Sequence, residues 1–419
     1  MKQLESEYSC INQCRLCESN QLIKIIDFGS VPLGNNLQKS IELSKSVSSY
    51  DLVVMNCKNC NHFQLNTAVS QTLLYATNYT YLSGTGISFV NHIKDYVSWV
   101  LKKTQLLNQG IIIDIGSNDG TCLKQFQRKK HIVCGVDPAE IPSDIAIQNG
   151  VPTINKFFNK KVADEIVSKY GQVDIVTSQN ALAHIDDLKS TFENIYNILK
   201  NRGFFVFEVG YFKKVLELMQ FDTIYHEHID YHHAGPLAKF LSKLGFDIIE
   251  INENKIQGGS LRFLLQKSNK QFISNKAKAF LTAEKQTILY NEAKMMLWSN
   301  DINSRMKNFR ELYFKLKSKK DICFAYGAPT KATLFLKMSG LNENDIDFIV
   351  DDNKLKVGRY MPQIGIQIKS SNNIECNISA LILLFAWNFS EDIIENLKKQ
   401  YKVPVTVIVP FPFLRVIEI

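Results

Sequence analysis

The sequence lacks any long hydrophobic run. Its longest apolar stretch, Ala380 to Trp387, is far too short to span a bilayer. An early charged segment followed by an apolar one, as in a signal peptide, is also missing. Basic residues are not clustered either, because the formal charge of +8 is spread over many lysines. We therefore expect a soluble cytoplasmic protein without a membrane or nucleic-acid partner, and with a weak preference for anionic ligands.

Length and cysteine usage narrow the class further. At 419 residues the chain is too long for one hydrophobic core, which predicts two or three domains. It contains no short internal repeat and no low-complexity segment. Nine cysteines without an export signal indicate metal or thiol chemistry rather than disulfides.

Two C-x-x-C pairs stand in the first segment, Cys14-Arg-Leu-Cys17 and Cys57-Lys-Asn-Cys60. Four thiolates match a tetrahedral zinc site, and a turn-rich insertion around Gly29 to Asn36 must lie between the pairs. A redox pair is the alternative, but neither motif opens a helix in a βαβ unit. His62 could replace one thiolate, although a packing role is favoured. We expect the remaining five cysteines to be buried fillers, namely Cys10, Cys122, Cys134, Cys323 and Cys376.

The apolar run that starts at Ile111 predicts a buried parallel strand, and it ends in the turn Asp114-Ile-Gly116-Ser-Asn118-Asp119-Gly120. Such a turn borders the ligand crevice of an open α/β sheet. A dinucleotide site needs a glycine where Asn118 stands, and the acidic flanks repel a pyrophosphate. The cationic nucleoside S-adenosylmethionine fits better. A second predicted strand ends in Asp137, which can accept both ribose hydroxyls. The alternative is a buried turn whose Asp and Asn bond their own backbone.

The segment just before this strand contains Tyr79-Thr-Tyr81-Leu-Ser83-Gly. We interpret it as a polar, aromatic lid or, alternatively, as a packed surface turn. An amphipathic helix follows, with apolar residues on one face. These are Phe89, Ile93, Val97, Val100 and Leu101.

Between residues 111 and about 268 strand and helix patterns alternate, which predicts a doubly wound α/β sheet. We expect strands near 111–115, 132–136, 173–178, 203–209, 246–252 and 260–266, and helices near 120–129, 160–169, 187–200, 211–219 and 235–244.

The rest of the chain again shows predicted helices and apolar strands. Residues 275–318 read as bridging helices, and a second α/β unit starts at the strand and glycine turn of 322–331. Further apolar strands are expected within 347–353 and 381–388. The predicted domains are thus a zinc-binding domain (1–70), a doubly wound α/β domain with its lid (71–274), a helical bridge (275–318) and a C-terminal α/β domain (319–419).

Chemistry is densest between Phe221 and His233, where four His, three acids and two Tyr occupy thirteen positions. Proton transfer is the favoured interpretation, because His titrates near neutral pH and a carboxylate or Tyr can orient it. A second metal site is an alternative, since His228 and His232 would lie one turn apart on a helix. A solvated polar loop is the third. A methyl donor beside a base suits an acceptor that must lose a proton, and a carbon acceptor also needs donors to stabilise its enolate.

These motifs resemble the zinc-containing sugar C-methyltransferases, which act on nucleotide-linked keto-deoxysugars in bacterial polysaccharide and antibiotic pathways. The resemblance covers nearly the whole chain. It rests on the cysteine pairs, the Tyr79 and Asp114 segments, and four further motifs. These are Asn180-Ala-Leu-Ala-His184, Phe221-Asp-Thr-Ile-Tyr-His-Glu-His228, Gly258-Gly-Ser-Leu-Arg262, and Val350-Asp-Asp-Asn353. It implies a zinc domain, a class I methyltransferase domain and a C-terminal Rossmann-like domain that helps to hold the nucleotide.

The resemblance also implies roles. His228 would be the base that removes the proton beside the ketone, supported by Glu227 and Tyr225, and His184 and Tyr79 would approach the sugar. The implied cofactor contacts are Asp114, Gly116, Asn118, Asp119, Gly120, Asp137 and Asn180. The implied substrate contacts are Tyr81, Ser83 and Lys331, with Arg359 and Asn388 as weaker candidates; Lys331 would face the diphosphate.

Some positions depart from the family pattern. Gln257 replaces a common histidine, Pro362-Gln363 replaces a frequent Pro-Gly, and Asp114 and Asp137 stand where glutamate is common. Gln257 leaves the sugar and the methylated carbon open. The alternatives are an O- or N-methyltransferase of nucleotide or capsular sugars, a zinc-ribbon RNA methyltransferase, and a non-catalytic sugar-binding protein. The oligomeric state stays open, with a monomer as the expectation.

Overall fold

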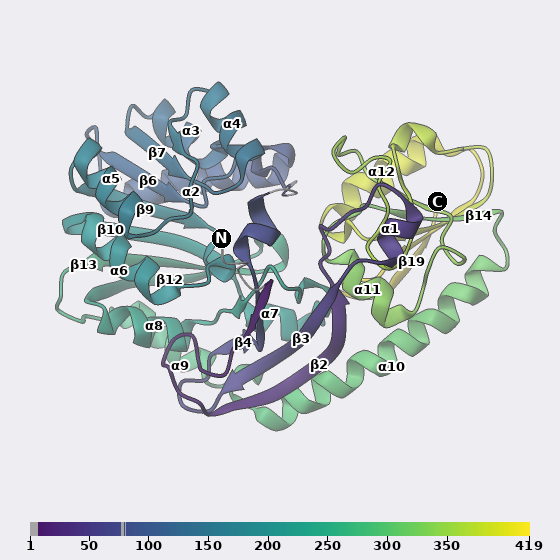
Figure 1. Ribbon diagram of the computed structural model, residues 1–419, viewed down its shortest axis with the longest axis horizontal. Coiled ribbons are helices and arrows are strands. Elements are labelled where there is room, and N and C mark those ends of the chain that lie inside the picture. The colour runs from purple at the N-terminus through teal and green to yellow at the C-terminus, as the bar shows by residue number, and fades with distance from the viewer. Residues whose placement is uncertain (1–6, 77–78, 80) are drawn as a thin grey trace, which may run out of the picture. The chain divides into compact units, whose positions relative to one another are not determined.

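The computed structural model describes residues 7–419 except 77, 78 and 80. The chain forms two compact units (Figure 1). Unit 1 consists of Met1–Ile23, Met55–Lys213 and Glu227–Tyr290, and unit 2 of Lys24–Val54, Lys214–His226 and Asn291–Ile419. Each unit is assembled from separate stretches of chain. The domain boundaries expected from the sequence stay a prediction.

Unit 1 is built on a seven-stranded sheet with the order β12-β13-β10-β9-β6-β7-β8. Its parallel strands are β6 (Ile111–Ile115), β7 (Ile132–Val136), β8 (Thr153–Ile154), β9 (Val173–Gln179) and β10 (Leu199–Gly210). Two antiparallel strands, β13 (Ser260–Lys267) and β12 (Phe246–Asn254), complete one edge. A mainly parallel sheet confirms the predicted α/β class.

Helices cover this sheet (Figure 1). They are α2 (Ile87–Thr104), α3 (Thr121–Arg128), α4 (Glu140–Gln148), α5 (Lys160–Tyr170), α6 (Leu188–Ile198), α8 (Ala234–Lys243) and α9 (Asn275–Glu284). The predicted apolar face of α2 packs into the core, where Ile93 and Val97 join Phe126 of α3 and Ile112 of β6. Burial of this stripe is the main driving force for docking the helices.

The strand order reverses between β6 and β9. From β6 the chain continues to β7 and β8 on one side, whereas β9 and β10 lie on the other. A ligand crevice forms at such a reversal, beyond the carboxyl ends of the strands. The turn after β6 and the Asn180 loop after β9 therefore border the same crevice.

The predicted strands and helices of this region are confirmed, with ends that shift by a few residues. In the seven-stranded sheet and the helices that cover it, the short strand β8 and helix α4 were not predicted. Pro142 lies in the first turn of α4, where a missing N–H costs nothing. A proline inside an apolar segment concealed this helix.

The cysteine-containing segment forms small antiparallel sheets. Strand β1 (Tyr8–Cys10) pairs with β5 (Thr67–Val69), and a four-stranded sheet has the order β11-β4-β3-β2. Its strands are β2 (Leu22–Pro32), β3 (Ser49–Cys57), β4 (Phe63–Leu65) and β11 (Asp230–Tyr231). Strand β11 follows His228 almost at once and pairs with β4, so the end of the histidine segment is anchored beside the second cysteine pair.

Unit 2 contains a six-stranded sheet with the order β16-β15-β14-β17-β18-β19. All neighbours are parallel except β18 and β19. The strands are β14 (Ile322–Tyr326), β15 (Phe348–Val350), β16 (Ile368–Lys369), β17 (Ala380–Leu384), β18 (Val405–Val409) and β19 (Arg415–Glu418). This confirms a second α/β unit. Strands β14 and β15 lie within the expected ranges and β17 begins one residue earlier than expected, whereas β16, β18 and β19 were not predicted.

The helices outside unit 1's sheet include the long α10 (Glu292–Lys317), which is prominent in Figure 1. The others are α1 (Ile41–Lys45), α7 (Phe212–Glu217), α11 (Ala332–Ser339) and α12 (Ser390–Gln400). Short helical turns occupy Thr72–Ala76, Ser83–Thr85, Leu182–His184, Phe221–Thr223, Ile256–Gly258, Ile288–Tyr290, Ser371–Asn373 and Trp387–Phe389. Among the described helices, none combines the length and apolar character that a bilayer crossing needs.

Candidate functional site

The four cysteines of the two C-x-x-C pairs come together. Their sulfur atoms all lie within 4.8 Å of one another, and Sγ of Cys14 is 3.5 Å from that of Cys60, as Sγ of Cys17 is from that of Cys57. Tetrahedral zinc with bonds of about 2.3 Å places its sulfurs about 3.8 Å apart. In addition, the Asn59 amide donates to Cys17 Sγ at 3.4 Å. The donor set and its spacing therefore fit a zinc ion.

The turn after β6 depends on glycine. Gly116 has a φ of +72°, and a Cβ there would lie 2.3 Å from Cβ of Ala181 in the loop after β9. The two loops thus approach so closely that a side chain at Gly116 is excluded. Its N–H donates to the Val136 carbonyl at 2.8 Å, which fixes the turn against the end of β7.

Two buried acids flank this turn. Asp114 accepts a hydrogen bond from the Thr177 hydroxyl at 2.7 Å, and burial raises its pKa to about 7. Asp137 accepts from the backbone N–H groups of Asn118 and Ala139, both at 2.9 Å, and burial raises its pKa as well. Burial destabilises the ionised form of both carboxyl groups, and a cationic or hydroxyl-bearing ligand would stabilise it.

Several buried polar atoms at the crevice lack a protein partner among the described residues. They are Oγ of Ser117, both side-chain polar atoms of Gln179 and Nδ2 of Asn180. Such atoms normally find a hydrogen bond, so a site that leaves four of them together is suited to a polar ligand. This test supports a nucleoside cofactor at the predicted position. The sequence singled out Asn180 but missed Ser117 and Gln179.

The segment predicted to be a lid, here residues 81–84, is hydrogen-bonded to the turn after β6. The Asn118 amide donates to the Tyr81 carbonyl at 3.0 Å and accepts from the Ser83 N–H at 2.9 Å. The Gly84 N–H donates to Asp119 Oδ2 at 2.7 Å. Asn118 and Asp119 are thus engaged with the lid in this structure. Gln257 adds a bond of 3.2 Å from its amide to the hydroxyl of the exposed Tyr81.

The histidine segment is not helical. Residues 224–229 form a turn that leads directly into β11, so His228 and His232 do not share a helix face. Within the part of the chain that the structure describes, only the four cysteines form a metal-like cluster. The interpretation of this segment as a second metal site was therefore wrong in its geometry.

Three of the four histidines are buried in the protein interior. In unit 2, His226 Nε2 lies 3.0 Å from the Tyr50 carbonyl, and burial lowers the His226 pKa to about 4. In unit 1, His233 contacts Glu284 and the Asn61 carbonyl, and His232 is also buried. His228 alone is half-exposed. Exposure thus separates the residue named as the base from its structural neighbours.

His228 faces a second histidine. The ring centroids of His184 and His228 are 4.9 Å apart. Nδ1 of His184 lies 2.6 Å from the Glu227 carbonyl and 3.0 Å from the Tyr75 hydroxyl. A carbonyl oxygen only accepts, so Nδ1 of His184 carries a proton. Burial lowers the pKa of His184, which keeps the ring neutral.

Two tyrosines border this pair. The Tyr79 ring is 5.5 Å from that of Tyr75, and burial raises the Tyr79 pKa well above its usual value, with the charges of Glu227 and Asp137 adding to the shift. Tyr79 therefore lies within electrostatic reach of both the histidine segment and the cofactor turn. Tyr75 was missed in the sequence, because only the folded turn at Thr72–Ala76 brings it to His184.

Unit 2 holds the remaining predicted contacts. Nζ of Lys331 lies 3.5 Å from the Trp387 ring centroid and 4.0 Å from Asp222 Oδ2, and burial lowers the Lys331 pKa to about 8. Trp387 also donates to Asp222 at 2.7 Å. Asn388 is exposed and Arg359 half-buried. Tyr225, also in unit 2, is half-buried.

Comparisons with known proteins match these parts in order. Models of a zinc binding domain, a methyltransferase domain and a C-methyltransferase C-terminal domain match residues 14–75, 91–251 and 255–412. The C-methyltransferase NovU from Streptomyces niveus is 29% identical over 414 residues, 97% of either chain. The chain is thus similar to a zinc-containing C-methyltransferase along nearly its whole length. The methyl donor of this C-methyltransferase is S-adenosylmethionine, and the four cysteines are its zinc site.

Two solved structures match part of this C-methyltransferase at low sequence identity. Magnesium protoporphyrin IX methyltransferase from Synechocystis PCC 6803 is 15% identical with a TM-score of 0.35, over 43% of this chain and 84% of that one. The PH0226 protein from Pyrococcus horikoshii OT3 is 16% identical with a TM-score of 0.36, over 45% and 95%. At such low TM-scores these matches establish nothing about the site or the substrate. Because the family methylates carbon, the alternatives of oxygen, nitrogen or RNA methylation are not supported.

Proposed function

We propose that this C-methyltransferase acts on the carbon α to the ketone of a nucleotide-diphospho-keto-deoxysugar, with His228 as the base. The observation that carries the proposal is the pairing of half-exposed His228 with His184, 4.9 Å between ring centroids, within reach of Tyr75 and Tyr79. A carbon acid needs both a base and donors for its enolate oxygen.

In the proposed reaction a ring nitrogen of His228 takes the proton from the carbon beside the ketone. The C–H electron pair moves into the enolate, and hydroxyl groups such as that of Tyr79 donate to its oxygen. Because the pKa of Tyr79 is raised, its proton is retained and available for donation. S-adenosylmethionine supplies an electrophilic methyl group, which leaves S-adenosylhomocysteine after transfer.

Other residues would bind rather than react. Glu227 is buried beside the base, and its carbonyl fixes the ring of His184. Tyr81 and Ser83 of the lid, and Lys331, Arg359 and Asn388 of unit 2, are the proposed sugar and nucleotide contacts. Tyr225 is proposed to support His228. The cationic Lys331 suits a diphosphate.

The test is proton exchange in deuterated water. We expect wild-type protein to wash deuterium into the α position of a keto-sugar and to methylate that carbon, and His228→Asn to lose both by at least about 100-fold. Asn keeps the size of the ring and removes its basic nitrogen. S-adenosylhomocysteine affinity should be unchanged, since it does not depend on the base.

A matched control is His92→Asn, which changes another partly buried histidine of unit 1, bound to Glu208 at 2.6 Å. It should retain exchange. If His228→Asn exchanges and methylates like wild type, His228 is not the base. Fragmentation of the product by mass spectrometry should locate the methyl on carbon.

A further inference from the structure

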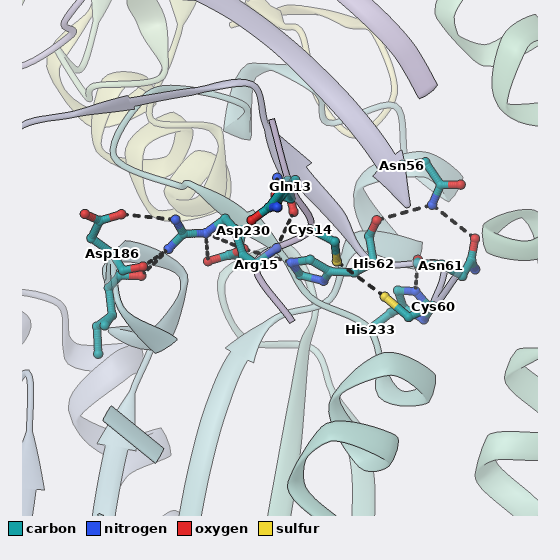
Figure 2. Close-up of polar contacts among 12 residues, drawn as sticks. Gln13, Cys14, Arg15, Asn56, Cys60, Asn61, His62, Asp186, Asp230 and His233 are labelled. Atoms are coloured by element: carbon teal, nitrogen blue, oxygen red, sulfur yellow. Dashed lines mark hydrogen bonds and ion pairs between the residues drawn. The ribbon is translucent and has the colours of Figure 1, made fainter. Parts of the chain in front are cut away.

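Arg15 lies between the two cysteines of the first pair, and its side chain is only 8% exposed. Its Nε donates to both carboxylate oxygens of Asp230 at 3.1 Å. Nη1 donates to Asp186 Oδ1 at 3.0 Å, and Nη2 donates to the carbonyls of Ile185, at 2.7 Å, and Asp186 (Figure 2). All three guanidinium nitrogens are therefore used.

These acceptors belong to the two segments that carry the histidine pair. Ile185 and Asp186 follow His184 directly, whereas Asp230 lies two residues beyond His228. The backbone joins the segments once, through the Ile229 N–H and the Ala183 carbonyl at 2.8 Å. The His184 ring also contacts the Glu227 carbonyl. Arg15 adds a further connection outside the histidine pair, and a planar guanidinium fixes direction as well as distance.

The backbone of Arg15 is fixed by hydrogen bonds as well. Its N–H donates to Gln64 Oε1 at 2.9 Å, and the Gln64 amide donates to the Gln13 carbonyl at 3.0 Å. Gln64 is also the register partner of Asp230 in the β4–β11 pair. Asp230 accepts another bond, 2.8 Å long, from His62 (Figure 2). Neither end of the Arg15–Asp230 pair is free to shift.

We propose that Arg15 is a positioning residue for methyl transfer, which holds the His184 loop against the His228 segment and so sets the separation of the two imidazoles. The inference rests on the proposed function of these histidines. If Arg15 only stabilised the fold, its ion pair with Asp230 would be sufficient. The bonds to two carbonyls next to His184 add the orientation that catalysis needs.

Arg15→Lys is the informative variant. Lysine keeps a positive charge opposite Asp230, but its single nitrogen cannot also hold the carbonyls of Ile185 and Asp186. We expect kcat to fall about 100-fold, as for a misplacement of about 1 Å. The KM for S-adenosylmethionine, the Kd for S-adenosylhomocysteine and the zinc content should stay near the wild-type values.

The matched control is Lys189→Ala. Lys189, a few residues after the His184 loop, pairs at 3.2 Å with Glu18, which directly follows the first cysteine pair, but the side chains are 52% and 70% exposed. An exposed pair contributes little, so kcat should be unchanged. If Arg15→Lys does not fold, Asp186→Ala is the second variant. It removes only the 59% exposed carboxylate contact, and we expect a smaller fall in kcat in the same direction.

Two readouts do not depend on turnover. Imidazole ¹⁵N signals of His184 and His228 should shift in Arg15→Lys and Asp186→Ala, and hydrogen exchange should quicken in peptides covering 181–187 and 227–231. Lys189→Ala should match wild type in both. Unchanged imidazole signals, or a loss of kcat matched by losses of cofactor affinity and zinc, would overturn the proposal. If wild type methylates no keto-sugar, the proposed function fails, whereas the imidazole signals still decide the role of Arg15.

Discussion

The Tyr75 hydroxyl lies 3.0 Å from Nδ1 of His184. It also donates to the Glu227 carbonyl at 3.1 Å, so it helps to fix the ring that faces His228. We predict that Tyr75→Phe lowers kcat about tenfold, in line with the loss of one orienting hydrogen bond. Calorimetry should find the affinity for S-adenosylhomocysteine unchanged. An unaltered kcat would show that the hydroxyl does not orient His184.

Asp114 should make cofactor binding depend on pH. Its folded-state pKa of about 7 exceeds the unfolded value, so its contribution to stability is complete below about pH 4 and is lost as the pH rises through 7. A bound cation favours the ionised carboxylate. The affinity for S-adenosylmethionine should therefore rise by up to about tenfold per pH unit below pH 7 and level off above it.

Titration calorimetry in buffers of different ionisation enthalpy checks this prediction. Proton release on binding at pH 6 should be seen in wild type and in Asp144→Asn, an exposed control on α4, and should vanish in Asp114→Asn. Proton release that persists in Asp114→Asn would assign the linkage to another group.

Asn118 should act mainly through the lid. Because its amide makes two bonds to the lid, Asn118→Ala should quicken hydrogen exchange in a peptide covering 81–86 and raise the KM for S-adenosylmethionine about tenfold. Arg128→Ala, an exposed change at the other end of α3, is the control. A raised KM with unchanged exchange in the lid would instead indicate direct contact between Asn118 and the cofactor.

Zinc should stabilise the fold. Cys57 is fully buried in the cysteine cluster and Cys10 is exposed outside it. We expect Cys57→Ser to lose the zinc and to lower Tm by about 10 °C or more, because metal binding energy is folding energy here. Cys10→Ser should retain one zinc per chain and the wild-type Tm. Metal analysis and a thermal melt in each case are sufficient.

The role of Lys331, in substrate binding or in stability, can be decided by measuring both KM and Tm. If it contacts the diphosphate, Lys331→Met should raise the KM for the nucleotide sugar about tenfold with little change in kcat. Exposed Lys354→Ala should have no effect. A fall in Tm without a change in KM would assign Lys331 only to its buried cluster with Trp387 and Asp222.

The sequence predicted most of both α/β sheets, because their strands are short apolar runs that end in turn residues. It also predicted the cysteine cluster, since C-x-x-C spacing is dictated by zinc geometry. Helix α4 was missed because Pro142 resembles a breaker, and the antiparallel strands β2 and β3 were missed because their pairing is remote from any local signal.

Some residues of the candidate site could likewise be predicted from the sequence, and others could not. Asp114, Asp137 and His184 stand at strand ends or in dense motifs, and their type already suggests chemistry. Tyr75 and Arg15 have no comparable signal in the sequence. Their importance comes from partners more than a hundred residues away, His184 for Tyr75 and Asp230 for Arg15, and only the folded chain brings them together.

Strand β11 gives the cysteine segment a dependence on distant sequence. Strand β4 pairs with Asp230 and Tyr231, so a fragment cut near residue 70 would expose the hydrogen-bonding edge of β4 to water. The segment is consequently not a portable module. A chimera that exchanges the first 70 residues with those of a relative would have to carry β11 as well, and with it the histidine segment that leads into that strand.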